Sequence, residues 1–176
     1  LEGSIRWDGS SRFRDEVRWQ SFWSAGAGWV ISRENFMSGI SKIDFLKLRA
    51  SYGEVGNDNL SSWYAFKSLY GIGYNNGTEA GTILTTVADP DVHWETKAQS
   101  DVALEFELFD RRLKGTLEYY NSETRDLLFA TKKPLNAGIP GNEVVTNIGA
   151  MVNRGYEVTL SADVIRNQNL KWNITA

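Results

Sequence analysis

The sequence predicts an all-β protein, and more specifically a segment of an antiparallel transmembrane β-barrel. Three observations predict it. Apolar and polar residues alternate in several runs of about nine residues, two of these runs are joined by a tight turn, and very short connections contrast with long ones. A helical period fits none of the runs, because residues three and four positions apart mix charged and apolar side chains.

The clearest element is a hairpin over residues 101–120. Its apolar positions are even in the first half and odd in the second, and residues directly opposite in an antiparallel pair share a face. The loop must therefore hold an even number of residues, which Asp110 and Arg111 supply. The expected register pairs Leu108 with Leu113, Phe106 with Gly115, Leu104 with Leu117, Val102 with Tyr119, Glu107 with Lys114 and Glu105 with Thr116.

The same alternation predicts further strands along the chain. They are Ser4–Trp7, Ser24–Ile31, Leu46–Val55, Thr96–Phe109, Leu113–Tyr120, Val152–Val164 and a strand from Leu170 onward. The last two have apolar residues at even positions, so their turn around Arg166–Asn169 should hold three or five residues. Ser32–Asn35 offers an N-cap, which predicts a short periplasmic helix before Leu46.

The connections suggest an orientation. Two short turns contrast with the long polar stretches Gly56–Val92 and Ser122–Glu143, and outer-membrane barrels have short periplasmic turns and long extracellular loops. If successive strands cross the membrane in opposite directions, the stretch between Val55 and Thr96 contains either no membrane strand or two. Trp63–Tyr70 and Thr82–Ala88 are the candidate pair, and the sequence leaves both alternatives open.

Composition excludes several classes of function. The formal charge is −3 with no long run of either sign, which argues against a nucleic-acid-binding surface. The absence of cysteine excludes disulfides and thiolate metal sites, and a single histidine, His93, excludes multi-histidine centres. No run of about 20 apolar residues is present to form a membrane-spanning helix. Leu1–Ser4 shows no signal peptide, so an exported protein would begin upstream.

Two sets of residues have competing interpretations. Aromatic residues near the predicted strand ends fit the interfacial girdles of a barrel or, equally, the core of a β-sandwich. They are Trp7, Trp29, Trp94, Trp172, Tyr119 and Tyr120. Asp89, Asp91 and Glu95 around His93 could suggest a calcium or catalytic cluster, but their spacing matches no EF-hand loop, so a solvated loop is the preferred interpretation.

Several phrases, taken in order, resemble the SusC/RagA family of TonB-dependent outer-membrane transporters. They are Arg6–Phe13, Ala27–Phe36, Leu46–Gly53 followed by Gly56-Asn57, Trp94–Leu113, Tyr119-Tyr120, Thr124–Leu128, Asn147–Gly149, and Asn153 with Gly155–Glu157. The resemblance covers nearly the whole chain. The chain departs from it at Trp19-Gln20, at Phe22–Ser24 and at Tyr156, which affects local turns and girdle packing.

The resemblance implies a fold, a location and partners. Family members form a barrel of 22 strands closed by an N-terminal plug, and they import oligosaccharides or peptides across the bacterial outer membrane. TonB supplies the energy, and a SusD-like surface lipoprotein caps the outer mouth. Residues 1–176 are expected to be a partial barrel domain of middle-to-late strands, without plug, TonB box or terminal strand. No enzymatic activity, cofactor or metal is expected.

The resemblance also assigns the two faces of the sheet. The apolar face would meet lipid and the polar face would line the lumen. The lumen-facing charges are expected to be Glu105, Glu107, Lys114, Glu118, Glu157 and Asp163. Candidate substrate contacts in the long loops are Trp63, Tyr64, Tyr70 and Tyr74, which could stack on sugar rings, with Asn75, Asn76, Asn136 and Asn142 as hydrogen-bonding residues.

Two other functions remain open from the sequence. A soluble, secreted β-sandwich that binds carbohydrate would pack the face of Val102 and Leu108 against a second sheet. A glycosidase-like enzyme would need two carboxylates about 5–10 Å apart in one cleft, and no spacing in the sequence places such a pair.

Overall fold

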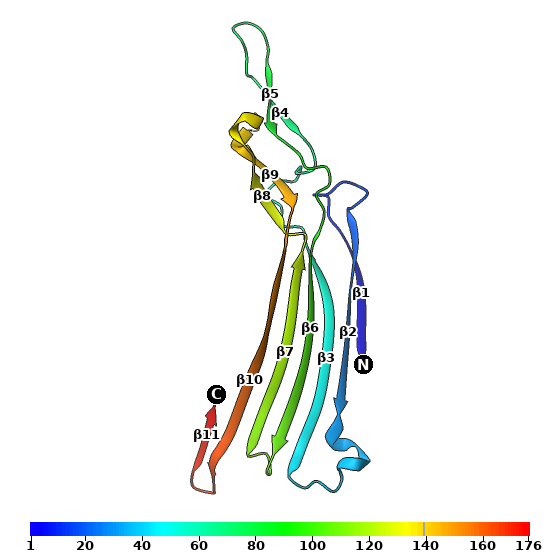
Figure 1. Ribbon diagram of the computed structural model, residues 1–176, viewed down its shortest axis with the longest axis vertical. Coiled ribbons are helices and arrows are strands. Elements are labelled where there is room, and N and C mark those ends of the chain that lie inside the picture. Colours follow the sequence, from blue (N-terminus) through cyan, green and yellow to red (C-terminus); the bar gives the residue numbers. More distant parts are fainter. Residues whose placement is uncertain (139) are drawn as a thin grey trace.

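One curved sheet of seven antiparallel strands forms the body of the protein in the computed structural model, which describes residues 1–138 and 140–176 (Figure 1). The strand order is β1-β2-β3-β6-β7-β10-β11. The bounds are β1 Glu2–Gly9, β2 Trp19–Val30, β3 Ile43–Asn57, β6 Glu95–Leu108, β7 Leu113–Arg125, β10 Ala150–Arg166 and β11 Lys171–Thr175. The two chain ends therefore lie at opposite edges of the sheet (Figure 1).

The predicted β6–β7 hairpin is confirmed, and all six predicted residue pairs occur in its register. The turn holds four residues, Phe109–Arg112, where the sequence predicted two. Phe109, Asp110 and Arg111 are left-handed, with φ of 57°, 56° and 62°, and so leave the ladder. Both loop lengths are even, so the assignment of faces is unchanged.

The prediction of an odd-numbered turn between β10 and β11 is wrong. Four residues, 167–170, separate Arg166 from Lys171, which are paired. The physical reason is a β-bulge: the register shifts between Asp163 and Ile165, so Val164 is an extra residue in β10. The sequence pattern placed the odd residue in the turn. It lies instead in the bulge, so the turn has an even number of residues.

The predicted periplasmic helix is present only as two short 3-10 turns, η1 Ile31–Arg33 and η2 Asn35–Met37. Neither begins with a side-chain cap, so the predicted N-cap role of Ser32–Asn35 is wrong. Two further 3-10 turns, η3 Leu135–Ala137 and η4 Pro140–Asn142, lie at the other end of the sheet. None of the helical segments among the described residues could span a lipid bilayer.

Two small hairpins stand above the sheet (Figure 1). β4 Leu69–Ile72 pairs with β5 Thr82–Thr86, and none of the described residues between β3 and β6 joins the main sheet. The alternative without membrane strands in that stretch is therefore the correct one. β8 Leu128–Lys132 pairs with β9 Glu143–Asn147, a hairpin that the sequence analysis did not predict. Residue 139 of this connection lies outside the described residues.

The hydrophobic core lies among the loops at the upper end of the sheet. Its buried members are Phe13, Phe22, Leu60, Ala65, Val92 and Trp94. They come from the β1–β2 loop, from β2 and from the connection between β3 and β6, so the core joins segments far apart in the sequence. Trp94 is buried here against Phe13 and Phe22, so its assignment to an interfacial girdle is wrong.

Candidate functional site

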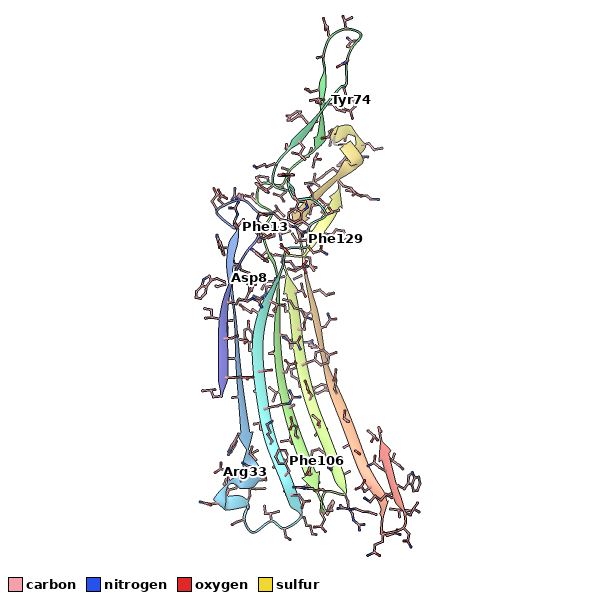
Figure 2. All side chains as sticks on the ribbon, turned by 180° about the vertical axis from the view of Figure 1, so that it is seen from behind. Asp8, Phe13, Arg33, Tyr74, Phe106 and Phe129 are labelled. Atoms are coloured by element: carbon pink, nitrogen blue, oxygen red, sulfur yellow. The ribbon has the colours of Figure 1, made fainter. Side chains whose placement is uncertain are left out.

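The main sheet has two chemically different faces, and both are open. Leu117, Val158 and Leu160, which share the apolar face, keep 43%, 55% and 40% of their surface exposed. No second sheet of the described residues covers this face, as a β-sandwich would require. Side chains project from both sides of the strands along their whole length (Figure 2).

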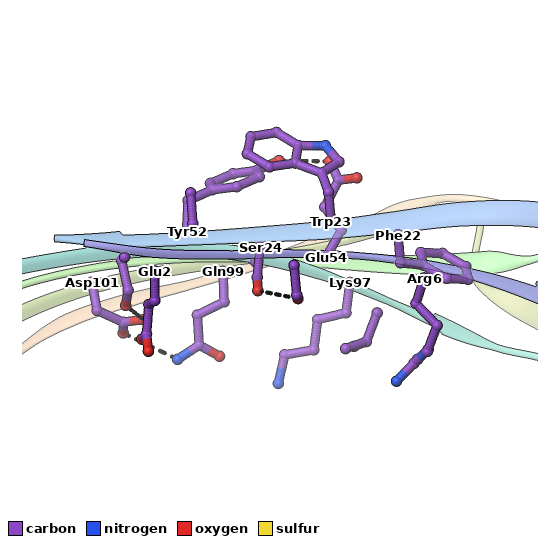
Figure 3. Close-up of a pocket in the computed structure, with 16 residues that line it drawn as sticks. Glu2, Arg6, Phe22, Trp23, Ser24, Tyr52, Glu54, Lys97, Gln99 and Asp101 are labelled. Carbon is purple, nitrogen blue, oxygen red and sulfur yellow. Dashed lines mark hydrogen bonds between the residues drawn. The ribbon is translucent and has the colours of Figure 1, made fainter.

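A close-up near the upper end of the sheet shows the same division (Figure 3). Trp23, Tyr52 and Glu54 lie on one side of the strands, while polar side chains lie on the other. The latter include Glu2, Arg6, Ser24, Lys97, Gln99 and Asp101. We call the side that carries Tyr52 and Leu117 the outer face, and the side that carries Gln99 and Glu118 the inner face.

Ion pairs cross the lower half of the inner face. Arg49 of β3 donates from Nε to Glu105 of β6 at 3.0 Å and from Nη2 to Glu118 of β7. All three side chains are half-buried. Three neighbouring strands are thus joined through one guanidinium group, whose planar fork suits two carboxylates at once.

A second group of charges lies closer to the lower turns. Lys114 and Arg111 both approach Glu107, with N–O distances of 3.4 Å and 3.1 Å. Lys47 approaches Glu105 at 3.8 Å. The structure therefore brings four predicted lumen-facing charges onto one face, and it adds basic partners that were not among the candidate site residues.

The remaining two predicted charges lie on β10. Glu157 is directly opposite Glu118 on the same face, and Asp163 accepts a hydrogen bond from Asn173 Nδ2 at 2.9 Å. Like charges directly opposite each other destabilise a strand pair. The contact of Arg49 with Glu118 offsets part of this repulsion, so the inner face combines a neutralised β3–β7 region with a more acidic β10.

Above the sheet, hydrogen bonds hold three loops together. Ser10 Oγ donates to the Asp58 carboxylate at 2.6 Å, and Arg12 Nη1 donates to the Asp58 carbonyl at 2.9 Å. Trp94 Nε1 donates to the Arg18 carbonyl at 3.1 Å. The loops after β1 and β3 are therefore fastened to each other and to the segment that enters β6.

The acidic residues around His93 act as loop cross-links. Glu95 accepts hydrogen bonds from the Leu128 amide at 2.9 Å and from Asn57 Nδ2 at 3.1 Å. Asp89 accepts one from the Thr146 hydroxyl, which attaches β9 to the segment before β6. Among the described residues, no group of three histidine or acidic side chains is placed to hold a metal ion.

The eight candidate substrate residues are distributed over three segments. Trp63 and Tyr64 precede β4, Asn136 and Asn142 lie in η3 and η4, and the other four lie in or beside the β4–β5 hairpin. Asn75 Oδ1 accepts a hydrogen bond from the Gly81 amide at 3.2 Å, so it shapes the hairpin tip. Tyr74 lies just after β4, near the start of the loop that connects β4 to β5 (Figure 2).

Trp63 is a candidate whose ring is held in place by another side chain. The Arg12 guanidinium lies over its ring at 4.4 Å from the centroid, and Arg12 is itself tied to Asp58. Trp63 nevertheless keeps 60% of its surface exposed. One ring face is therefore held by a cation while the rest of the indole is open to a ligand.

Known proteins share this architecture. A model of the family described as TonB dependent receptor-like, beta-barrel, matches residues 1–176. TonB-dependent receptor P39 of Formosa agariphila is 37% identical over 98% of this chain, and TonB-dependent receptor SusC of Bacteroides thetaiotaomicron is 30% identical over 98%. The chain spans 16% and 18% of these two relatives, about a sixth of their length.

Solved structures of the RagAB peptide transporter are similar as well. One matches 98% of this chain and 19% of its own chain, with a TM-score of 0.82 and 28% identity. A structure of the RagAB peptide importer in the closed-closed state matches equally well, with a TM-score of 0.82 and 25% identity. From its sequence, its two-faced antiparallel sheet and these matches, the chain belongs to the TonB-dependent receptor β-barrel family of the SusC/RagA type.

Proposed function

We propose that this chain forms wall and extracellular loops of a TonB-dependent transporter that imports oligosaccharides or peptides across the bacterial outer membrane. The observation that carries the proposal is the two-faced sheet. Its outer face presents exposed aliphatic side chains such as Leu117 and Val158, whereas its inner face presents a network of charges around Arg49. A lipid-facing wall around a polar lumen has this distribution.

The similar proteins support the choice of substrates and partner. RagAB is described as a peptide importer and SusC as a TonB-dependent receptor, and both match nearly all of this chain. We propose that a SusD-like surface lipoprotein works with the complete protein, that TonB drives it, and that Glu105, Glu107, Lys114, Glu118, Glu157 and Asp163 face its lumen. The lower, tightly turned end of the sheet is then periplasmic and the packed loops are extracellular.

Spin labels on two neighbouring residues of the complete protein in lipid test the wall. A label at Leu117 should collide readily with oxygen, which partitions into hydrocarbon, and poorly with a water-soluble nickel chelate. A label at Glu118 should not show that preference, because consecutive strand residues point to opposite faces. A label at Leu117 that the nickel chelate reaches as readily as oxygen would contradict the proposal.

Trp63 is the proposed stacking platform for substrate, because Arg12 fixes it and the ring stays open. Trp63→Ala should raise the substrate concentration needed for half-maximal uptake, and Trp63→Phe should retain most of the uptake. Phe36→Ala removes an exposed aromatic residue in η2, which follows the lower end of β2, and serves as the control. Uptake assays with oligosaccharides and with peptides would identify the substrate class, and equal uptake by Trp63→Ala and Phe36→Ala would exclude the platform.

A further inference from the structure

The outer face changes from apolar to polar at one level across three strands. Ser100 of β6, Asn121 of β7 and Arg154 of β10 oppose one another in the register. Below this row, the outward positions of these strands carry no charged residue. They are Val102, Leu104, Phe106 and Leu108 on β6, Leu113, Gly115, Leu117 and Tyr119 on β7, and Tyr156, Val158, Leu160 and Ala162 on β10.

Aromatic side chains mark the same level. Tyr119 and Tyr156 form a tilted pair with ring centroids 5.1 Å apart in the row directly below. Tyr52, opposite Ser100, packs against Trp23 with centroids 4.6 Å apart, and its hydroxyl donates to Glu54 (Figure 3). Amphipathic rings collect where hydrocarbon meets water and headgroups, so this row lies at the outer boundary of the membrane.

Arg154 is the unusual residue at this boundary. On β7, the uncharged Asn121 lies directly opposite Arg154, and no acidic residue of that strand bonds to the guanidinium. The acid in the next row, Glu123, is bonded to Arg125 at 2.7 Å. A guanidinium beside hydrocarbon is stable when it reaches the headgroup region, and its planar donors fit phosphate oxygens.

We propose that Arg154 binds the phosphate of an anionic lipid headgroup in the outer leaflet, with Tyr156 beside the glycerol or sugar backbone of that lipid. This inference rests on the proposed membrane location. It adds a lipid-binding site on the outside of the wall, separate from the transport path on the inner face. The chemistry required of the ligand is an anionic phosphate attached to a lipid that lies at the depth of the Tyr119–Tyr156 row.

Retention of lipid A by the complete, detergent-purified protein tests the site. Arg154→Gln should lower the lipid A retained per protein at equal added lipid, with binding weakened about tenfold, as for the loss of one charge-assisted hydrogen-bonding group. Arg154→Lys should retain part of the binding. Arg125→Gln is the matched control, because Arg125 already has Glu123 as its partner.

Two results would overturn the inference. Arg154→Gln could retain as much lipid A as the unchanged protein. Alternatively, inorganic phosphate at the same concentration could displace the lipid fully, which would indicate a site for free anions. Failure of the inference is distinguishable from failure of the proposed function, because the spin label at Leu117 reports lipid contact independently of Arg154.

Discussion

At the scale of single residues, aromatic rings lie over glycines of neighbouring strands. Gly9 pairs with Trp19, Gly155 pairs with Tyr120, and Gly115 pairs with Phe106. A Cβ atom built on Gly115 would lie 2.5 Å from Phe106 Cζ and 2.8 Å from Leu160 Cδ2. The glycines therefore provide the space in which the rings cover the backbone of the adjacent strand, which helps to fix the register.

Gly115→Ala should destabilise the complete barrel by about 0.5–1.5 kcal/mol, because the far ends of the Phe106 and Leu160 side chains must turn away from the added methyl group. Denaturant unfolding in detergent, followed by the mobility of folded and unfolded protein in gels, measures the change. Gly3→Ala is the matched control, since its nearest atom, the Ser24 carbonyl oxygen, lies at an ordinary 3.6 Å. Equal stability of the two variants would show that the ring does not fix the register.

At the scale of elements, the packed loops form a unit separate from the sheet. Phe13 is fully buried in the β1–β2 loop, where it contacts Trp94 with centroids 5.2 Å apart. Val92 is also fully buried, and the bond between Ser10 and Asp58 joins the same loops. The loops are therefore held by a core to which the sheet contributes Phe22 of β2, while the other buried apolar side chains of the main sheet are the small Ala98 and Ala103.

Phe13→Ala should loosen these loops without unfolding the wall. Removing a buried phenylalanine costs about 3–5 kcal/mol, and here the loss falls on the loop core. Faster proteolysis of residues 58–94 in whole cells, with unchanged heat-modifiability of the barrel, is the expected result. Phe129→Ala is the control, because Phe129 is exposed on β8 (Figure 2). Global unfolding by Phe13→Ala would contradict the separation of the two units.

The elements also show how far the sequence could predict this fold. The register of β6 and β7 follows from alternation and the position of the turn, because one face is apolar from Val102 to Tyr119. The bulge at Val164 could not be predicted, since an extra apolar residue leaves the pattern of β10 intact. The β8–β9 hairpin was missed because its strands have five residues each and only partial alternation.

The sequence also predicted only part of the candidate site. It predicted which face each residue lies on, but not the contacts between segments that are far apart in the chain. Residue type and parity place Glu105 and Glu118 on one face, whereas the Arg49 contact that joins them depends on which strands are neighbours. β3 and β6 are neighbours only because the 37 residues between Asn57 and Glu95 stay out of the sheet. For the loop residues, Trp63 gains its support from Arg12, 51 positions earlier in the chain, and no periodicity reports such a contact.

At the scale of the whole molecule, the surroundings of the sheet decide which substitutions are tolerated. Val158 points outward and its neighbour Thr159 points inward, and both are exposed. In water, an arginine at either position would have little effect on stability, because surface substitutions usually change it by less than about 0.5 kcal/mol. In a bilayer, the outward arginine would lie in hydrocarbon.

Val158→Arg should therefore destabilise the complete protein in the membrane by about 2–4 kcal/mol, whereas Thr159→Arg, facing a polar lumen, should cost far less. Val158 and Leu117 are directly opposite, two rows from the polar boundary at Arg154 and Asn121, so the substituted side chain has no headgroup within easy reach. The amount of folded protein in isolated outer membranes, and its unfolding in lipid vesicles, measure the difference. If both arginine variants assembled and unfolded alike, the outer face would be in contact with water and the seven strands would not be a membrane wall.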